Sequence, residues 1–561
     1  MNRHRYFPLF EQSSIIEERG VFKKRNWGNF KVSWNRRRKL GILMHISSLP
    51  GKYGIGDLGE VALEFIDFLV DAGCAAWQVL PTGPTSSAAG HSPYSGPSAF
   101  AGNVAFISPD DLAERGLLDG VNLREFEERP GKTVDLDKAC ATKKKIVSDA
   151  YDNFRRDDAY KTRFRDFSDE FWDFCVREGY WLEDYALFSA LKQTAGDVSW
   201  HEWPRAYAVR DWSVLDPLKA ESEMARMIDV CRFGQFIFFK QMEKLGAACR
   251  ERDIELIGDM PIYVGYDSAD VWGHQDLFRL DGEGRPTCVA GVPPDYFSET
   301  GQRWGNPIYN WDKMRDDGFY WWLGRFHHIL LHMNKVRIDH FRGLLGYWEI
   351  PADEATAMNG EWKPGPGRDF FHSLRYCFGQ NLGGRLPFIA EDLGVMTDDV
   401  LAAMDEFGLP GMKVLHFAFG DGMSTNPYVP HHHRRNSVVY VGTHDNNTTV
   451  GWWDDDATST EKNNFLQYIG RAETEKIDPL AVRTAMLRMA VASTADIAIL
   501  TAQDLLGLDG AARMNIPSTP RGNWNWRLEN LDGLKRQARH IKELALLYDR
   551  CDAPENERSA G

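Results

Sequence analysis

Residues 42–81 read ILMHISSLPGKYGIGDLGEVALEFIDFLVDAGCAAWQVLP, and this stretch decides the fold class. The apolar run at 42–46 predicts a first strand, and the run at 76–81 predicts a second one. Between them apolar residues recur at helical spacing, and Asp57 and Glu60 are spaced as in a capping box. Two strands joined by one helix predict a βαβ unit, in which the strands pair in parallel.

Six further apolar runs, most of them followed by helical pattern, bring the number of expected strands to eight. Continuous apolar runs are typical of strands that are buried on both faces. Eight such strands with helices between them predict an α/β fold, a (β/α)8 TIM barrel, in preference to a doubly wound sheet. No glycine-rich phosphate-binding motif follows any of them, so a nucleotide site is not expected. The six runs lie at 254–262, 335–341, 386–394, 411–419, 437–446 and 498–507.

The stretch between the second and third expected strands is too long for a barrel loop. Residues 82–253 are therefore expected to form a large inserted subdomain, and its periodicity is mostly helical. The barrel would then comprise 39–81 and 254–545 with inserted loops. Residues 1–38 are expected to form an N-terminal arm, and 546–561 a polar C-terminal tail.

The composition limits the class of protein and its partners. The 561 residues are 43% hydrophobic and 26% charged, with a formal net charge of -15, which is a globular composition with an acidic balance. Such a charge argues against nucleic acid and anionic membranes as partners. No apolar run is long enough to span a bilayer, and the N-terminal stretch lacks the apolar region of a secretory signal. The eight cysteines form no C-x-x-C pair, which indicates free thiols in a reducing cytoplasm.

Acidic residues stand at the carboxyl ends of five of the eight expected strands. Active sites of TIM barrels collect at that end of the barrel. Like charges crowded at one mouth destabilise a fold, so a set of this size indicates function rather than packing. The residues are Asp259, Asp339, Glu391 with Asp392, Asp445 and Asp504.

Glycosidic cleavage is a reaction that needs clustered carboxylates and no metal. One carboxylate acts as nucleophile or base, and a second carboxyl group protonates the leaving oxygen. Arg337 precedes Asp339 by two residues, so on a strand both side chains point to the same face. The guanidinium favours the ionised form that a nucleophile must keep. Glu391 has no arginine near it in sequence and suits the raised pKa that an acid catalyst needs.

Metal-assisted hydrolysis is the competing chemistry. The three consecutive histidines at 431–433 and His444 beside a carboxylate are its candidate ligands. Consecutive histidines point in different directions and do not converge on one ion. We therefore expect exposed histidines, no metal and no cofactor.

Long motifs at the strand ends and between them resemble the amylomaltase, or disproportionating-enzyme, family of 4-α-glucanotransferases. The likeness runs from about residue 39 to residue 528. It implies α-1,4-glucans and maltooligosaccharides as substrates, and transfer of a glucan segment to the 4-hydroxyl of an acceptor by a retaining double displacement. The motifs are HISSLPGKYGIGDLG, SPYSGPSAFAGN, GDMPIYV, GVPPDYFSETGQRWGNPIYNW, RIDHFRG, AEDLG, GMKVLHFAF, GTHDNNTT and ARMNIPSTPRGNWNWRL.

The resemblance also implies a role for individual residues. Asp339 matches the nucleophile, Glu391 the acid/base, and Asp445 the third carboxylate, which grips the sugar being distorted. This chain departs from the family pattern at His91, where relatives tend to have an acidic residue, and at His416, where they often have glutamine. The residues that match substrate contacts or supports of the nucleophile are Arg337, His340, His444, Asp259, Asp392, Tyr94, Ser92, Gln302, Trp304 and Phe417.

Two other functions remain open from the sequence. An α-glucan hydrolase of the amylase group would use the same carboxylates but pass the sugar to water. A non-catalytic glucan-binding barrel would have no need of all three carboxylates. Transfer requires an occluded site, for which the aromatic loop 293–304 is expected to serve as a lid. The oligomeric state is left open.

Overall fold

The computed structural model describes residues 38–552 apart from 157–162, 295–297, 380–381, 395 and 473–475. Nearly all of the predicted N-terminal arm, and the predicted tail from 553 onward, lie outside the described residues. No helix in the described ranges is long and apolar enough to cross a lipid bilayer.

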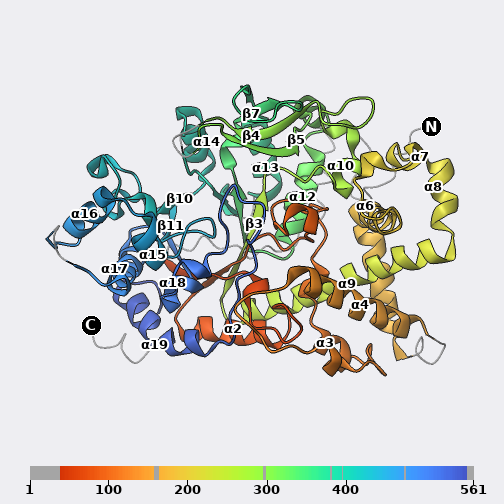
Figure 1. The fold of residues 1–561 in the computed structure, drawn as a ribbon, viewed down its shortest axis with the longest axis horizontal. Coiled ribbons are helices and arrows are strands. Elements are labelled where there is room, and N and C mark those ends of the chain that lie inside the picture. The colour runs from red at the N-terminus through yellow and green to blue at the C-terminus, as the bar shows by residue number, and fades with distance from the viewer. Residues whose placement is uncertain are drawn as a thin grey trace.

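Eight parallel strands close into a barrel in the order β1-β12-β11-β10-β9-β6-β3-β2. The predicted (β/α)8 barrel is confirmed, and each expected run contributes one strand. Figure 1 shows helices α6, α7 and α8 gathered at one end of the molecule and α16, α17 and α19 at the other. The strands are β1 (Lys39–Leu43), β2 (Ala76–Gln78), β3 (Glu255–Pro261), β6 (Lys335–Asp339), β9 (Phe388–Ala390), β10 (Gly411–Val414), β11 (Ser437–Tyr440) and β12 (Ile497–Thr501).

Helices follow most of the strands and also build the insertion. The longest, α6 and α9, pack against each other, and Phe171 of α6 meets Phe236 of α9 edge-on at 5.6 Å. The helices are α2 (Glu60–Asp71), α3 (Pro109–Glu114), α4 (Leu136–Arg155), α6 (Arg165–Thr194), α7 (Arg205–Ala208), α8 (Trp212–Lys219), α9 (Ser222–Glu251), α10 (Ala269–Gly273), α11 (Trp311–Asp316), α12 (Tyr320–Leu330), α13 (Gly367–Phe378), α14 (Asp398–Phe407), α15 (Thr449–Gly451), α16 (Ser459–Tyr468), α17 (Pro479–Ala492), α18 (Ala502–Leu506) and α19 (Asp532–Leu547).

The insertion between β2 and β3 is mostly helical, as predicted. Its last helix, α9, packs against α4 and α6 of the insertion but also against α2 and β3 of the barrel. One continuous helix therefore packs on both the insertion and the barrel. For this reason the boundary at residue 253 between an inserted subdomain and the barrel stays a prediction.

The interior of the barrel is packed with buried side chains. Ile257, Met412, Val438 and Ile499 belong to one buried cluster inside it. Tyr440 belongs to the same cluster and donates a hydrogen bond to Gln78 Oε1 across 2.8 Å. Because the interior is filled, polar side chains collect beyond the carboxyl ends of the strands.

The strands end earlier than predicted, and this changes the role of one acidic residue. Strand β12 stops at Thr501, whose hydroxyl accepts from the backbone N–H of Asp504 and starts α18. Asp504 is buried, and its Oδ1 accepts from the N–H of Thr449 across 2.7 Å. The expectation that Asp504 joins the acidic rim is therefore wrong, because its carboxylate anchors a neighbouring loop.

The expected capping box at the start of α2 is also wrong. The helix begins after Gly59, which offers no side chain. Asp57 instead accepts from the Gly59 N–H with one oxygen and binds Lys143 Nζ of α4 at 2.9 Å with the other. The carboxylate thus ties the barrel to the insertion through a buried ion pair.

A four-stranded antiparallel sheet, ordered β5-β4-β7-β8, was not predicted. It is formed by long loops that follow β3 and β6, and Figure 1 shows it along one edge of the molecule. It matters for the site because β5 carries Gln302 and Trp304. Its strands are β4 (Cys288–Val292), β5 (Gln302–Pro307), β7 (Gly346–Pro351) and β8 (Glu361–Pro364).

Candidate active site

Asp339, the last residue of β6, is paired with a buried arginine. Arg337 Nη2 donates to Asp339 Oδ1 across 2.8 Å, and Nη1 donates to both oxygens of Asp259 at 2.9 and 2.8 Å. The expectation that Arg337 and Asp339 point the same way is met. The Asp339 side chain keeps 28% of its surface exposed, whereas that of Asp259 keeps none. One guanidinium therefore holds an accessible carboxylate and a buried one.

Glu391, which follows β9, has a different environment. Its Oε2 accepts from the backbone N–H of His340 across 2.7 Å, and its Oε1 from the N–H of Leu393 across 2.8 Å. His340 has φ 51°, and this left-handed conformation turns its N–H toward the carboxyl group. Burial, and then the negative charge of Asp339, raise the pKa of Glu391 to about 7, although Arg337 and the two N–H groups oppose them. A carboxyl group with that pKa can both give and take a proton near neutral pH.

Asp445, beyond β11, is held in its ionised form. Asn515 Nδ2 donates to its Oδ1 across 2.6 Å, and His444 Nε2 lies 3.2 Å from its Oδ2. Burial favours the neutral acid, but His444 and Asn515 outweigh it and hold the pKa of Asp445 well below its usual range. In turn, burial disfavours the charged imidazole, yet Asp445 raises the pKa of His444 overall.

Two residues that hold Asp445 were missed from the sequence. Arg513 Nη2 donates to the backbone oxygen of Asp445 across 2.7 Å, and Asn515 binds its side chain. Both lie after β12 in the motif ARMNIPSTPRGNWNWRL, which carried the family resemblance. The motif was the signal that could have identified these two residues, but nothing in its sequence indicated a contact with Asp445.

Tyr94 joins the two halves of the acidic cluster. Its hydroxyl donates to Asp259 Oδ2 across 2.8 Å and lies 2.8 Å from His444 Nε2. The ring stacks on His444 with centroids 5.2 Å apart, and Ser92 Oγ accepts from the Tyr94 N–H across 3.2 Å. A continuous chain of polar contacts therefore runs from Asp339 through Arg337, Asp259, Tyr94 and His444 to Asp445.

Exposed aromatic side chains flank the carboxylates. Trp304 on β5 is 37% exposed, meets the ring of His340 edge-on at 4.8 Å, and donates its indole N–H to Gln302 Oε1. Phe417, beyond β10, is 38% exposed and packs edge-on against Tyr428. Apolar rings left exposed beside charged groups are suited to stacking on sugar rings. The expected lid is described only in part, since 295–297 lie outside the described residues.

Asp392 lies beneath the site rather than at its surface. It is buried, its Oδ1 accepts from the N–H of Met412, and its Oδ2 lies 3.5 Å from Lys413 Nζ. A Cβ on Gly411 would come within 2.3 Å of Asp392 Oδ2, so this close packing requires glycine there. Asp392 and Asp259 thus both have protein partners, and their contact with a substrate stays a prediction.

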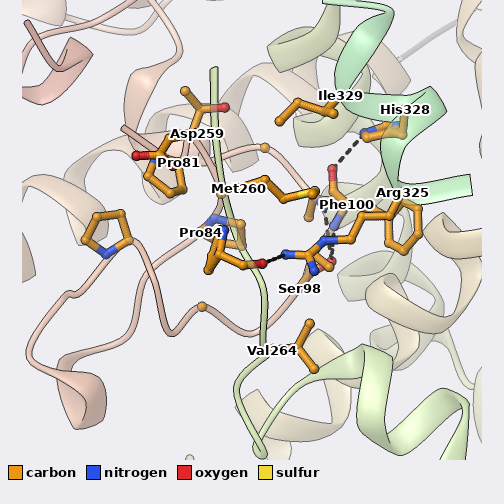
Figure 2. A pocket seen from close by; sticks show the side chains of 18 of the residues that line it. Pro81, Pro84, Ser98, Phe100, Asp259, Met260, Val264, Arg325, His328 and Ile329 are labelled. Atoms are coloured by element: carbon orange, nitrogen blue, oxygen red, sulfur yellow. Dashed lines mark hydrogen bonds between the residues drawn. The ribbon is translucent and has the colours of Figure 1, made fainter. Parts of the chain in front are cut away.

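A pocket of about 90 Å³ lies beside the carboxylates without including Asp339, Glu391 or Asp445. Figure 2 shows His328 and Arg325 reaching from α12 into it, with His328 hydrogen-bonded to the backbone oxygen of Phe100. Tyr94 and Asp259 line it as well. The pocket therefore lies against the loop that carries Tyr94, and it does not hold the acidic cluster.

The candidate metal ligands do not come together. His431 and His432 are exposed, whereas His433 is buried and bonds Ser493 Oγ at 2.6 Å and the oxygen of Tyr428 at 2.8 Å. Within the described residues no group of three or more histidine, cysteine, aspartate or glutamate side chains has the geometry of a metal site.

Comparisons with known proteins agree with one another. The family model described as 4-alpha-glucanotransferase matches residues 44–532. A 4-alpha-glucanotransferase of Aquifex aeolicus is 42% identical over 513 residues, which are 91% of this chain and 99% of that protein. A 4-alpha-glucanotransferase of Thermus thermophilus is 45% identical over 492 residues, covering 88% and 95%. The amylomaltase of Streptococcus agalactiae, solved in complex with acarbose, has a TM-score of 0.83 and 34% identity, covering 92% and 100%.

Proposed function

The chain belongs to the family of 4-alpha-glucanotransferases. From this premise we propose that it moves a segment of an α-1,4-glucan to the 4-hydroxyl of an acceptor glucose or glucan. The proposed mechanism is a retaining double displacement. The observation that carries the proposal is the pairing of an accessible Asp339, bound to the Arg337 guanidinium, with a Glu391 whose pKa is raised to about 7. A nucleophilic carboxylate needs a cationic partner of this kind, and an acid/base catalyst needs a raised pKa.

In the first step Asp339 attacks the anomeric carbon of the donor. Arg337 supports this step because its Nη2 donates to Asp339 Oδ1 and orients the carboxyl group beside a positive charge. Glu391, protonated, gives its proton to the glycosidic oxygen as the bond breaks. The products are a covalent glucosyl ester on Asp339 and a released glucan.

In the second step Glu391 takes the proton of the acceptor 4-hydroxyl. The oxygen of that hydroxyl attacks the same anomeric carbon, the ester to Asp339 breaks, and an α-1,4 bond forms again. Two inversions give retention. The pKa of about 7 lets Glu391 alternate between acid and base without a second catalyst.

Asp445, His444 and Tyr94 are proposed to hold the sugar whose bond breaks. Asp445 is ionised and can accept hydrogen bonds from sugar hydroxyls, whereas His444 and Tyr94 form a stacked pair beside it. Asp259 and Asp392 are proposed as positioning residues instead, because both are buried and occupied by protein partners. The remaining predicted contacts, His340, Ser92, Gln302, Trp304 and Phe417, are kept as proposals.

Transfer rather than hydrolysis depends on how well an acceptor competes with water. Trp304 and Phe417 leave exposed aromatic surface next to the carboxylates, which supports sugar binding. The loop 293–304 is retained as the proposed lid. A cytoplasmic location is proposed because the eight cysteines are scattered and form no C-x-x-C pair, and disulfides are rare in that compartment.

Incubation with maltotriose tests the proposal. The expected result is glucose together with oligomers longer than maltotriose, and few new reducing ends. Steady growth of reducing ends would favour a hydrolase, and glucan binding without turnover would favour a non-catalytic barrel. Asp339→Asn serves as the control, because it keeps the shape of the site and removes the nucleophile.

A further inference from the structure

A second, smaller pocket of about 20 Å³ lies at the mouth of the barrel, and two histidines from opposite ends of the chain line it. His45 follows β1, and His444 follows β11. Strands β1 and β11 both flank β12 in the barrel, so these two histidines come from strands that are one strand apart. Neither the family motifs nor the acidic cluster gives His45 a role.

His45 has a buried imidazole that packs against an aromatic ring. Its ring packs edge-on against Phe106 with centroids 5.4 Å apart, and 7% of the residue is exposed. Its Nδ1 is buried and has no hydrogen-bond partner in the part of the chain that the structure describes. Burial and the neighbouring charge of His444 lower the pKa of His45 to about 3, so the ring is neutral. An aromatic hydrocarbon would fill the same space, and a buried unpaired nitrogen is costly.

His444 lines the other side of the pocket, and its orientation determines how it meets the proposed sugar. Its Nε2 is shared between the Tyr94 hydroxyl at 2.8 Å and Asp445 Oδ2 at 3.2 Å. The charged or titratable groups that face it are Asp445, Asp259, Arg337, Tyr94 and His45. The partner of the second ring nitrogen sets the tautomer and tilt of a histidine. A fixed partner on the pocket side would therefore fix how His444 meets the proposed sugar.

The pocket has the size and lining for one water molecule. A water needs roughly 10–15 Å³ of this kind of volume and two to four polar partners. Thr443, Thr448 and Gln503 line the pocket together with the two histidines. We propose that this pocket binds one ordered water that joins the imidazole of His45 to that of His444, which makes His45 a positioning residue for the glucan site.

The proposal rests on the proposed function in one respect, that His444 contacts the sugar whose bond breaks. The water site itself is observable without any turnover, in a high-resolution crystal structure of the full chain. The expected density is one fully occupied water within hydrogen-bond distance of both rings. A dry pocket, or a water bound to His444 and not to His45, would overturn it.

Three variants separate positioning from packing. His45→Leu is expected to lose about tenfold in kcat/KM on maltotriose, the effect of one lost hydrogen bond. His45→Asn and His45→Gln each place an amide near one of the ring nitrogens, and at least one of them is expected to restore most of the activity. If all three variants lose activity in proportion to their fall in melting temperature, His45 is a packing residue and the proposal fails.

A double-mutant cycle tests the route through His444. In a His444→Asn background, His45→Leu is expected to cause little further loss. His416 provides a matched control, because it is also buried with an unpartnered Nδ1 but stacks on Trp452 and does not line the pocket. His416→Leu is expected to act independently of His444→Asn. Additive losses for His45→Leu and His444→Asn would contradict the proposal, whereas a wild-type chain inactive on maltotriose would contradict the proposed function alone.

Discussion

Asp339 and Glu391 end neighbouring strands of one barrel, yet their surroundings differ in kind. Asp339 faces a guanidinium, whereas Glu391 accepts from two backbone N–H groups and lies next to the negative charge of Asp339. The first environment favours a carboxylate and the second favours a carboxylic acid. The difference shows how one fold sets two protonation states with one type of side chain.

Removing the ionised member of the pair is expected to have the largest effect. Asp339→Asn should lower kcat by about ten-thousandfold or more, since no covalent ester can form. Steady-state rates on maltotriose measure it. Asp504→Asn is the matched control, because that carboxylate also follows a strand of the barrel, β12, but accepts from the backbone N–H of Thr449. Its activity should stay close to wild type while its melting temperature falls. Appreciable activity in Asp339→Asn would mean that another group is the nucleophile.

Removing the protonated member is expected to have a smaller effect that depends on the leaving group. Glu391→Gln should slow maltotriose turnover by about 100- to 10,000-fold, the usual contribution of general acid catalysis. Formation of the covalent intermediate from α-maltosyl fluoride should be much less affected, because fluoride departs without a proton. An equal loss on both donors would assign Glu391 a role other than acid.

Removing the guanidinium tests what maintains the difference. Arg337→Met leaves Asp259 buried without its cationic partner, and breaking a buried ion pair in this way costs about 3–5 kcal/mol of folding free energy. Arg337→Lys keeps a charge but cannot bind Asp339 and Asp259 together, so its loss should be intermediate. Denaturant unfolding gives both values. Equal stability of Arg337→Met and wild type would show that the charge pair is not what orders this side of the site.

The stability of the wild type against pH should report Glu391 directly. Its folded pKa of about 7 lies above the unfolded value, so the folded state holds the proton more tightly. The wild type therefore loses stability relative to Glu391→Gln as the pH rises from about 4.5 to 7, by up to about 3 kcal/mol, and the difference is constant above that range. Parallel curves for the two proteins would show that the Glu391 pKa is not raised.

The smallest expected effect is at the rim. Trp304→Ala removes an exposed ring that meets the ring of His340 edge-on. We expect a severalfold loss of kcat/KM, which corresponds to about 1 kcal/mol of lost sugar stacking. We also expect a larger share of hydrolysis. Product profiles from maltotriose measure this share. An unchanged profile would remove Trp304 from the proposed substrate contacts.

The barrel was predictable because eight apolar runs repeat and each is buried on both faces. The ends of those runs were not, since the same apolar pattern continues into short helices. Residues 411–419 illustrate this: β10 ends at Val414 and a single helical turn places Phe417 at the rim. Asp504 was misplaced for the same reason. The small sheet was missed because its strands are short and lie in loops, where pairing partners are distant in sequence.

The acidic cluster was predictable to the extent that strand ends converge. The prediction that Arg337 and Asp339 point to the same face followed from the two-residue period of a strand. That Asp259 and Asp392 lie beneath the surface was not predictable, since burial depends on Tyr94 and Gly411 from other elements. The two residues that hold Asp445 could not be predicted, because Arg513 and Asn515 are distant from it in sequence and contact it in the closed barrel.

Trapping the covalent intermediate tests the central claim most directly. Glu391→Gln incubated with α-maltosyl fluoride and no acceptor should accumulate a glycosyl ester, since the base of the second step is missing. Proteolysis and mass spectrometry should place the sugar on Asp339, within RIDHFRG. A sugar on Asp445 or any other residue would contradict the assignment of the nucleophile. Release of products with no covalent adduct, together with inversion at the anomeric carbon, would contradict the double displacement itself.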